Sequence, residues 1–238
     1  MIIDFLRGFA LLIAYFVVCA CCALLIRRFI SVPKEAFRKL LHIILLGSIF
    51  PWLYAFMDWR MSVLAAVAFA AVVYPILLLC ERFPGYSELL TERKHGEIRR
   101  SLIVVFGMFA ALISICWGFL GERYFVLAAI LGWGFGDAAA ALVGKRFGRH
   151  YLSGRLIEGR KSVEGSAAMF VTAFAAILTV MLVNNAVVWH GYLPIASLTA
   201  LVCAAVELYT KNGMDTLTCP VAAAAVMIPL IRFWGGGI

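Results

Sequence analysis

Long apolar segments alternate with short polar segments along the whole chain. A helix that crosses a bilayer needs about 20 apolar residues, and the chain offers eight such segments, of which the seventh is short. The pattern therefore predicts an all-α, polytopic integral membrane protein that forms one transmembrane domain over residues 1–238. The expected spans are 5–26, 40–57, 61–80, 101–120, 124–143, 163–183, 195–206 and 217–234.

Composition supports a membrane protein and excludes several other classes. Hydrophobic residues make up 64% of the chain and charged residues 14%, whereas soluble domains have about 25% charged residues. The mean hydropathy is +0.99. A soluble globule, a disordered chain, a collagen and a coiled coil are all excluded by these values. The seven cysteines lack the paired spacing of a zinc site, so they are expected to be small buried residues.

Basic residues are distributed unevenly between the two sets of alternate loops. The net charge is +8, and 17 of the 21 Lys and Arg residues fall on one set of loops. By the positive-inside rule these loops are cytoplasmic, and both termini lie on the non-cytoplasmic side. We therefore attribute the positive net charge to the orientation of the protein in the membrane, and we expect no nucleic-acid partner. So compact a chain favours a bacterial inner membrane over the ER membrane, and an oligomer is compatible with it.

Asp137 is the outstanding candidate for chemistry, because acidic residues near the hydrocarbon are costly and usually functional. Gly136, Ala140, Gly144 and Gly148 follow at four-residue spacing beside it, so another helix backbone can approach closely. One interpretation is a packing helix whose Asp137 pairs with a neighbouring arginine. The other is a carboxylate that binds a divalent cation beside a phosphate-binding loop.

The segment after Asp137 favours the second interpretation, because it combines glycines with cations. Backbone N–H groups of glycines and the charges of Lys and Arg both stabilise phosphate oxygens. Ser162 is expected to cap the sixth span and so to present a positive helix end. No Walker motif occurs. The candidate phosphate-binding residues here are Gly144, Lys145, Gly148, Arg160, Lys161, Ser162 and Gly165.

Two further clusters are expected on the same membrane face. Arg38, Lys39 and His42 open the second span, and Arg38 and His42 share a helix face. Glu207 ends the seventh span, and Asp215 begins the eighth. Each cluster also has a purely structural interpretation. Arg38 and Lys39 would then only extend to the membrane interface, and His42 would be hydrogen-bonded within the fold. The two acids would be solvated in a loop.

A magnesium site is expected because Mg²⁺ prefers carboxylates, waters and substrate phosphates as ligands. The candidate ligands are Asp137, Glu164 and Asp215. Such a site on the cytoplasmic face would join a polyanionic, water-soluble donor to a lipid acceptor. The short seventh span and the small residues of the fifth leave room for an acyl or prenyl chain.

The central motif resembles the nucleotide-binding signature of the dolichol kinase/phytol kinase family. Its residues are Asp137-x-x-Ala140-x-x-x-Gly144-x-x-x-Gly148, followed by the segment from Lys161 to Gly165. The family includes CTP-dependent diacylglycerol kinases and is related to phosphatidate cytidylyltransferases. The resemblance covers roughly residues 38–220.

Two flanking motifs extend the resemblance, and one segment departs from it. Arg38-Lys39-x-x-His42 is similar to the basic motif of the family, and 215–220 is similar to its late acidic segment, with Thr216 in place of the usual Asn. The family often has Trp-Pro shortly before the lysine, whereas Gly159 and Arg160 stand here.

The resemblance implies CTP-dependent phosphorylation of a lipid alcohol of polyprenol, dolichol, phytol or diacylglycerol type, with Mg²⁺ as cofactor. Asp137, Lys161, His42 and Glu207 are then the expected catalytic residues, the last two as candidate bases. Two other classes stay open. A cytidylyltransferase would release pyrophosphate from CTP, and a transporter would use an intramembrane acid in an ion pathway.

Overall fold

The computed structural model describes residues 2–83, 85–86, 96–154, 157, 159, 161–211 and 213–234. The chain divides into two compact units, Met1–Gly121 and Glu122–Ile238, each of which is described by itself. Eight helices in the described ranges are long and apolar enough to cross a membrane. The predicted all-α membrane fold with eight spans is therefore confirmed.

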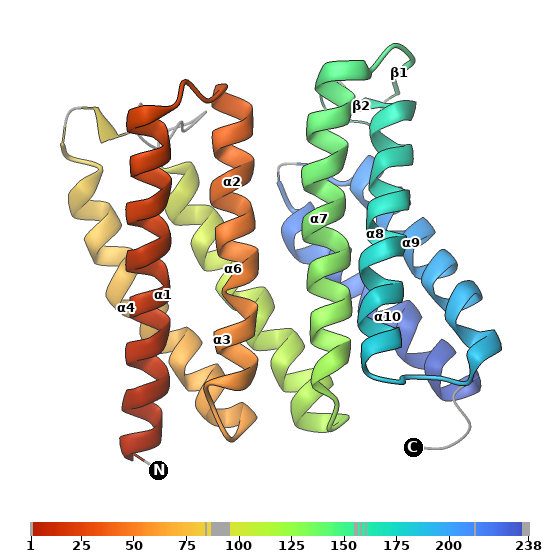
Figure 1. Ribbon diagram of the computed structural model, residues 1–238, viewed down its shortest axis with the longest axis horizontal. Helices are drawn as coiled ribbons and strands as arrows, with labels where there is room; N and C mark the ends of the chain where they lie inside the picture. Colours follow the sequence, from red (N-terminus) through yellow and green to blue (C-terminus); the bar gives the residue numbers. More distant parts are fainter. Residues whose placement is uncertain are drawn as a thin grey trace. The chain divides into compact units, whose positions relative to one another are not determined.

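The first unit is a bundle of helices in which α4 packs along α6 and α1 contacts α2, α3 and α4 (Figure 1). A short π-helix, η1, continues α6 in the same direction and also contacts α4. The elements are α1 (Ile2–Phe29), α2 (Lys34–Gly47), α3 (Ile49–Tyr54), α4 (Trp59–Cys80), α6 (Glu97–Leu112) and η1 (Ile113–Phe119).

Local sequence signals explain where these helices begin. Pro33, whose missing N–H suits a helix start, immediately precedes α2. The Asp58 carboxylate accepts a hydrogen bond from the Arg60 N–H at 3.0 Å and so caps α4. Gly96 precedes α6 with a φ of 74°, a left-handed conformation that glycine adopts without strain.

The second unit packs α8 closely along α7, with α9 beside α8 and α10 against α9 and α7 (Figure 1). A two-stranded antiparallel hairpin joins α7 to α8 and pairs Tyr151 with Ser162 and Leu152 with Lys161. The elements are α7 (Arg123–Phe147), β1 (Tyr151–Leu152), β2 (Lys161–Ser162), α8 (Val163–Val183), η2 (Trp189–Gly191), α9 (Tyr192–Tyr209) and α10 (Asp215–Trp234).

Glycines make the close contact between α7 and α8. A Cβ atom on Gly132 would lie 2.8 Å from the Ile177 side chain, and one on Gly136 would lie 3.0 Å from the Met169 sulfur. Further along α7, a Cβ atom on Gly144 would lie 3.6 Å from the Gly165 Cα atom. The predicted small-residue face of this helix is confirmed, because it admits the neighbouring helix at backbone distance.

Three expected boundaries differ from the structure. The second span, expected from residue 40, begins at Lys34, so Arg38 and Lys39 lie within the helix as the shared face of Arg38 and His42 predicts. The fifth span, expected to end at residue 143, continues to Phe147 and includes Gly144 and Lys145. The seventh span was expected to be short, but it runs from Trp189 to Tyr209, 21 residues. The room that a short span would leave for a lipid chain is therefore not available from this helix.

Candidate functional site

An ion pair between Lys161 and Glu207 forms the centre of the candidate site in the second unit. The Lys161 Nζ atom lies 2.9 Å from the Glu207 Oε1 atom and also donates to the Glu207 backbone carbonyl. The two side chains are only 20% and 13% exposed. The pair ties strand β2 to the last turn of α9, 46 residues further along the chain. A partly buried pair of this kind is costly to break from one side.

Two more acids surround this pair. The carboxylates of Asp137 on α7 and Asp215 on α10 both lie within electrostatic range of Glu207. Each is partly buried. Asp137 and Asp215 therefore act electrostatically, from α7 and α10, on the ion pair that joins β2 to α9. Mutual repulsion among the acids makes the cluster receptive to a cation or to the positively charged side of a ligand.

Carboxylate oxygens are among the ligands that Mg²⁺ prefers, so the chemistry of Asp137 and Asp215 is compatible with this ion. Within the described ranges, no group of three or more His, Cys, Asp and Glu side chains forms a complete metal cage. Mg²⁺ usually takes one or two carboxylates and fills its other positions with water and substrate phosphates. Asp137 and Asp215 supply this number of carboxylates.

Glu164, the third expected metal ligand, contacts a histidine instead. Its Oε1 atom lies 2.7 Å from His150 Nδ1, and the His150 backbone N–H donates to the same oxygen at 3.2 Å. His150 also accepts a hydrogen bond from the Val163 N–H through its carbonyl. The contacts hold the start of β1 against the first turn of α8. Sequence reasoning missed His150, because only the hairpin brings it to Glu164.

The glycines and Ser162 of the expected phosphate loop have structural contacts. The Ser162 hydroxyl accepts a hydrogen bond from the Gly165 N–H at 3.1 Å, so the predicted helix cap is confirmed. A Cβ atom on Gly144 would lie 3.3 Å from the Ser162 Oγ atom, and one on Gly148 would lie 2.9 Å from it. These three glycines therefore let α7, the hairpin and α8 meet, and nucleotide contact by them stays a prediction.

The remaining candidate cations of this unit lie in different settings. Lys145 is exposed in the last turn of α7, and Arg149 follows beyond the end of that helix. Lys161 is the partly buried cation described above. Arg160, also expected to bind nucleotide, lies outside the described residues.

The basic motif of the first unit, Arg38, Lys39 and His42, lies on one side of helix α2. Arg38 pairs with Glu35 at 2.5 Å and with Glu97 of α6 at 3.6 Å. Lys39 is only 6% exposed, an unusual burial for a lysine. His42 is partly buried one turn later. Sequence reasoning missed Glu35, although its three-residue spacing from Arg38 is a recognisable helical pair.

These features define a class: a polytopic helical membrane protein in which acids and a lysine converge between helices of one unit. No family model matches the chain. The chain is similar to the phytol kinase of Synechocystis sp. (strain ATCC 27184 / PCC 6803 / Kazusa), with 29% identity over 223 residues, 89% of this chain and 86% of the relative. The resemblance to phytol and dolichol kinase-type lipid kinases is thereby confirmed over most of the chain.

Proposed function

We propose that this protein is a lipid-alcohol kinase that transfers the γ-phosphate of CTP to the hydroxyl group of a membrane lipid. One observation carries the proposal: Lys161, Glu207, Asp137 and Asp215 converge in a chain similar over 89% of its length to a phytol kinase. Phosphoryl transfer needs mainly positioning and charge neutralisation. A cation beside several carboxylates between helices supplies both.

Lys161 is the residue best placed to bind the phosphates. In the structure its ammonium group is neutralised by Glu207. When a nucleotide brings further negative charge, the ammonium group can exchange its contact with Glu207 for phosphate oxygens. Lys145, Arg160, Arg38 and Lys39 are proposed as further phosphate contacts. Arg38 would then exchange its ion pair with Glu35 for a contact with a phosphate oxygen in the same way.

Asp137 and Asp215 are the carboxylates proposed to hold magnesium. The ion, when bound, neutralises charge on the β- and γ-phosphates. Glu164 is a weaker candidate, because His150 already contacts its carboxylate through a side-chain nitrogen and the backbone N–H.

Glu207, in the second unit, is the proposed general base, and His42, in the first unit, is the other candidate for this role. Once Lys161 turns to the phosphates, the Glu207 carboxylate is free to accept the proton of the lipid hydroxyl. The hydroxyl oxygen forms a bond to the γ-phosphorus, the bond from that phosphorus to the bridging oxygen breaks, and the nucleoside diphosphate leaves. The loose transition state places little demand on a strong base.

The lipid alcohol that accepts the phosphate is proposed to come from the membrane. Polyprenols, phytol and diacylglycerol all present a hydroxyl group at the bilayer surface, so each is a candidate. The excess of 17 of 21 basic residues on one set of loops supports an active site on the cytoplasmic face. We extend the proposal to a bacterial inner membrane, because so compact a chain favours it over the ER membrane.

The direct test uses purified full-length protein with γ-labelled CTP or ATP and a panel of lipid alcohols. We expect label in the organic phase with CTP, Mg²⁺ and an alcohol, and release of CDP. Asp137→Asn should abolish the transfer, because it removes a proposed metal ligand. The matched control is Arg146→Ala, whose exposed guanidinium group stacks on Phe147 and takes no part in the site.

Three outcomes would overturn the proposal. Pyrophosphate release with formation of a CDP-lipid would identify a cytidylyltransferase. Lipid-independent solute flux in proteoliposomes without nucleotide would identify a transporter. Equal turnover by Asp137→Asn and wild-type protein would place the chemistry elsewhere.

A further inference from the structure

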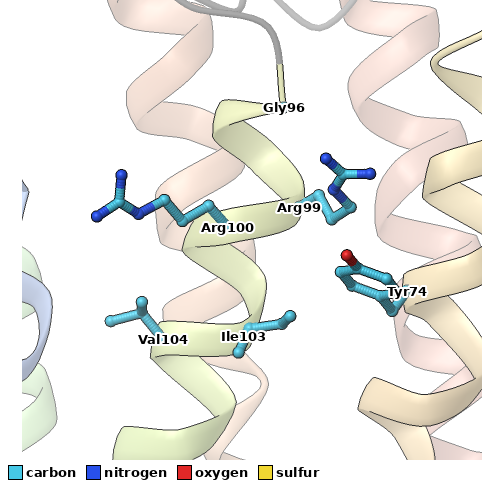
Figure 2. A pocket seen from close by; sticks show the side chains of 6 residues that line it. All are labelled: Tyr74, Gly96, Arg99, Arg100, Ile103 and Val104. Atoms are coloured by element: carbon cyan, nitrogen blue, oxygen red, sulfur yellow. The ribbon is translucent and has the colours of Figure 1, made fainter.

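The first unit contains a cavity between the end of α4 and the beginning of α6 (Figure 2). Its volume is about 380 Å³, within the range of small ligand sites. None of its lining residues belongs to the acidic cluster described above. The lining residues are Tyr74, Gly96, Arg99, Arg100, Ile103 and Val104.

Arg99 is held in place on one flank of the cavity. Its guanidinium group lies 3.4 Å from Glu81 and 5.3 Å from the centre of the Tyr74 ring. A Cβ atom on Gly96 would lie 3.2 Å from Arg99 Nη2, so a larger residue there would crowd the guanidinium group. Figure 2 shows Arg99 directed toward Tyr74. Such a fixed donor fork loses little entropy when it binds an anion.

Arg100 supplies a second cation. It is exposed, and no ion pair or side-chain hydrogen bond joins its guanidinium group to another described residue. It projects to the opposite flank of α6 from Arg99 (Figure 2). Because Glu81 offsets the charge of Arg99 and no described acid pairs with Arg100, the lining residues of the cavity carry a net positive charge that favours an anion.

The floor of the cavity is apolar. Ile103 and Val104 follow Arg99 and Arg100 at four-residue spacing, one helical turn deeper into the span that begins at Glu97. Ile103 is 47% exposed. The site therefore presents two cations at the level where a bilayer has its headgroups and two aliphatic side chains at the level of its acyl chains.

We propose that this cavity binds an anionic phospholipid. The phosphate binds at the level of Arg99 and Arg100, whose guanidinium groups flank the cavity, and an acyl chain follows Ile103 and Val104. The apolar floor distinguishes this occupant from a soluble phosphate, which would gain nothing from Ile103 and Val104. The proposal does not depend on the kinase activity, because none of these residues belongs to the proposed reaction site.

The test is native mass spectrometry of the full-length protein released from detergent micelles with added phosphatidylglycerol or phosphatidylcholine. We expect one tightly bound phosphatidylglycerol and no comparable binding of phosphatidylcholine. Arg100→Gln should weaken the binding of phosphatidylglycerol about fivefold, the effect of one interfacial cation. This exposed residue makes no contact that folding needs, so the variant is expected to fold. Tyr74→Phe should have little effect, because the ring and not the hydroxyl group packs on Arg99.

The matched control is Arg28→Gln, another exposed arginine, at the end of α1, that does not line the cavity. Wild-type affinity in this control, together with the loss in Arg100→Gln, would support the site. Equal losses in the two variants would overturn it, since binding would then follow total charge alone. Equal affinity for the two lipids, or full competition by soluble glycerol phosphate, would also overturn the proposal.

Discussion

The two units hold their helices together by different means. In the first, large rings interlock: the ring centres of Phe69 and Phe106 are 5.2 Å apart, and Trp52 lies 5.7 Å from Phe106. In the second, glycines let backbones meet, as at Gly136 of α7 and Met169 of α8. Because lipid tails are as apolar as these side chains, packing rather than burial from water has to distinguish the folded state.

The charged contacts are of two kinds, local and long-range, and the first unit contains both, since Arg38 of α2 also pairs with Glu97 of α6. The pair of Arg38 with Glu35 lies within one helix of the first unit and forms wherever that helix forms. The pair of Lys161 with Glu207 joins distant segments and exists only when β2 and α9 are in place. The close approach of α7 and α8 therefore does more than pack helices, because it brings separate chain segments to one cluster.

The largest effect is expected for Lys161→Ala. Transfer of label to lipid should fall about 1,000-fold, or about 4 kcal/mol in the barrier, because the proposed phosphate contact is lost. Lys161→Arg should lose less, since it keeps the positive charge. The assay is the labelled-CTP transfer, with size-exclusion chromatography to show that each variant is folded. Wild-type turnover in folded Lys161→Ala protein would contradict the assignment.

The aromatic core should give the next largest effect. Phe106 is 2% exposed and contacts Trp52, Phe69, Phe16 and Phe109. Phe106→Ala should lower the free energy of unfolding by about 3 kcal/mol, mainly through the cavity that it leaves.

The measurement is equilibrium unfolding of the purified protein in mixed detergent micelles. Phe119→Ala is the matched control, because that ring is 83% exposed and its loss should cost less than about 0.5 kcal/mol. Similar losses in both variants would show that ring packing does not stabilise the first unit.

The glycine contact of the second unit should be sensitive to added volume. Gly136→Val should destabilise the protein by about 2 kcal/mol, because its Cβ atom would lie 3.0 Å from the Met169 sulfur and 3.3 Å from the Met169 carbonyl oxygen. Gly107→Ala is the control in α6, where a Cβ atom meets nothing within 4 Å. This substitution should stabilise by up to about 1 kcal/mol. Destabilisation by both would mean that added volume is not the cause.

Elements with local signals could be predicted from the sequence, and those that depend on packing could not. The sixth span was expected at 163–183 and lies at Val163–Val183, because Ser162 marks its start. The seventh was expected from residue 195, but Pro194 lies in the first turn of α9, where proline is tolerated. The hairpin strands are two residues each, too short for a hydrophobic pattern.

The same distinction applies to the candidate site. Asp137 was identified as a costly acid near the hydrocarbon, Lys161 as a phosphate-binding cation, and Glu207 and Asp215 as acids at the ends of two spans. The structure pairs Lys161 with Glu207 and places Asp137 and Asp215 within electrostatic range of Glu207. The contact of Lys161 with Glu207 in particular could not be predicted, because 46 residues and a helix packing separate the two. Gly144 and Lys145 were expected in a loop, but α7 continues through them where Gly144 meets Ser162 and Gly165.

The smallest effect concerns the cap that connects the hairpin to α8. Ser162→Ala removes the acceptor for the Gly165 N–H and should destabilise the protein by about 1 kcal/mol. Thr179→Ala is the control on the same helix, since its hydroxyl only donates to the Ala175 carbonyl, which the helix already satisfies. It should change the free energy of unfolding by less than about 0.5 kcal/mol. If the two variants unfold alike, the cap does not hold Lys161 in position, and the hairpin must be fixed by the contact of His150 with Glu164.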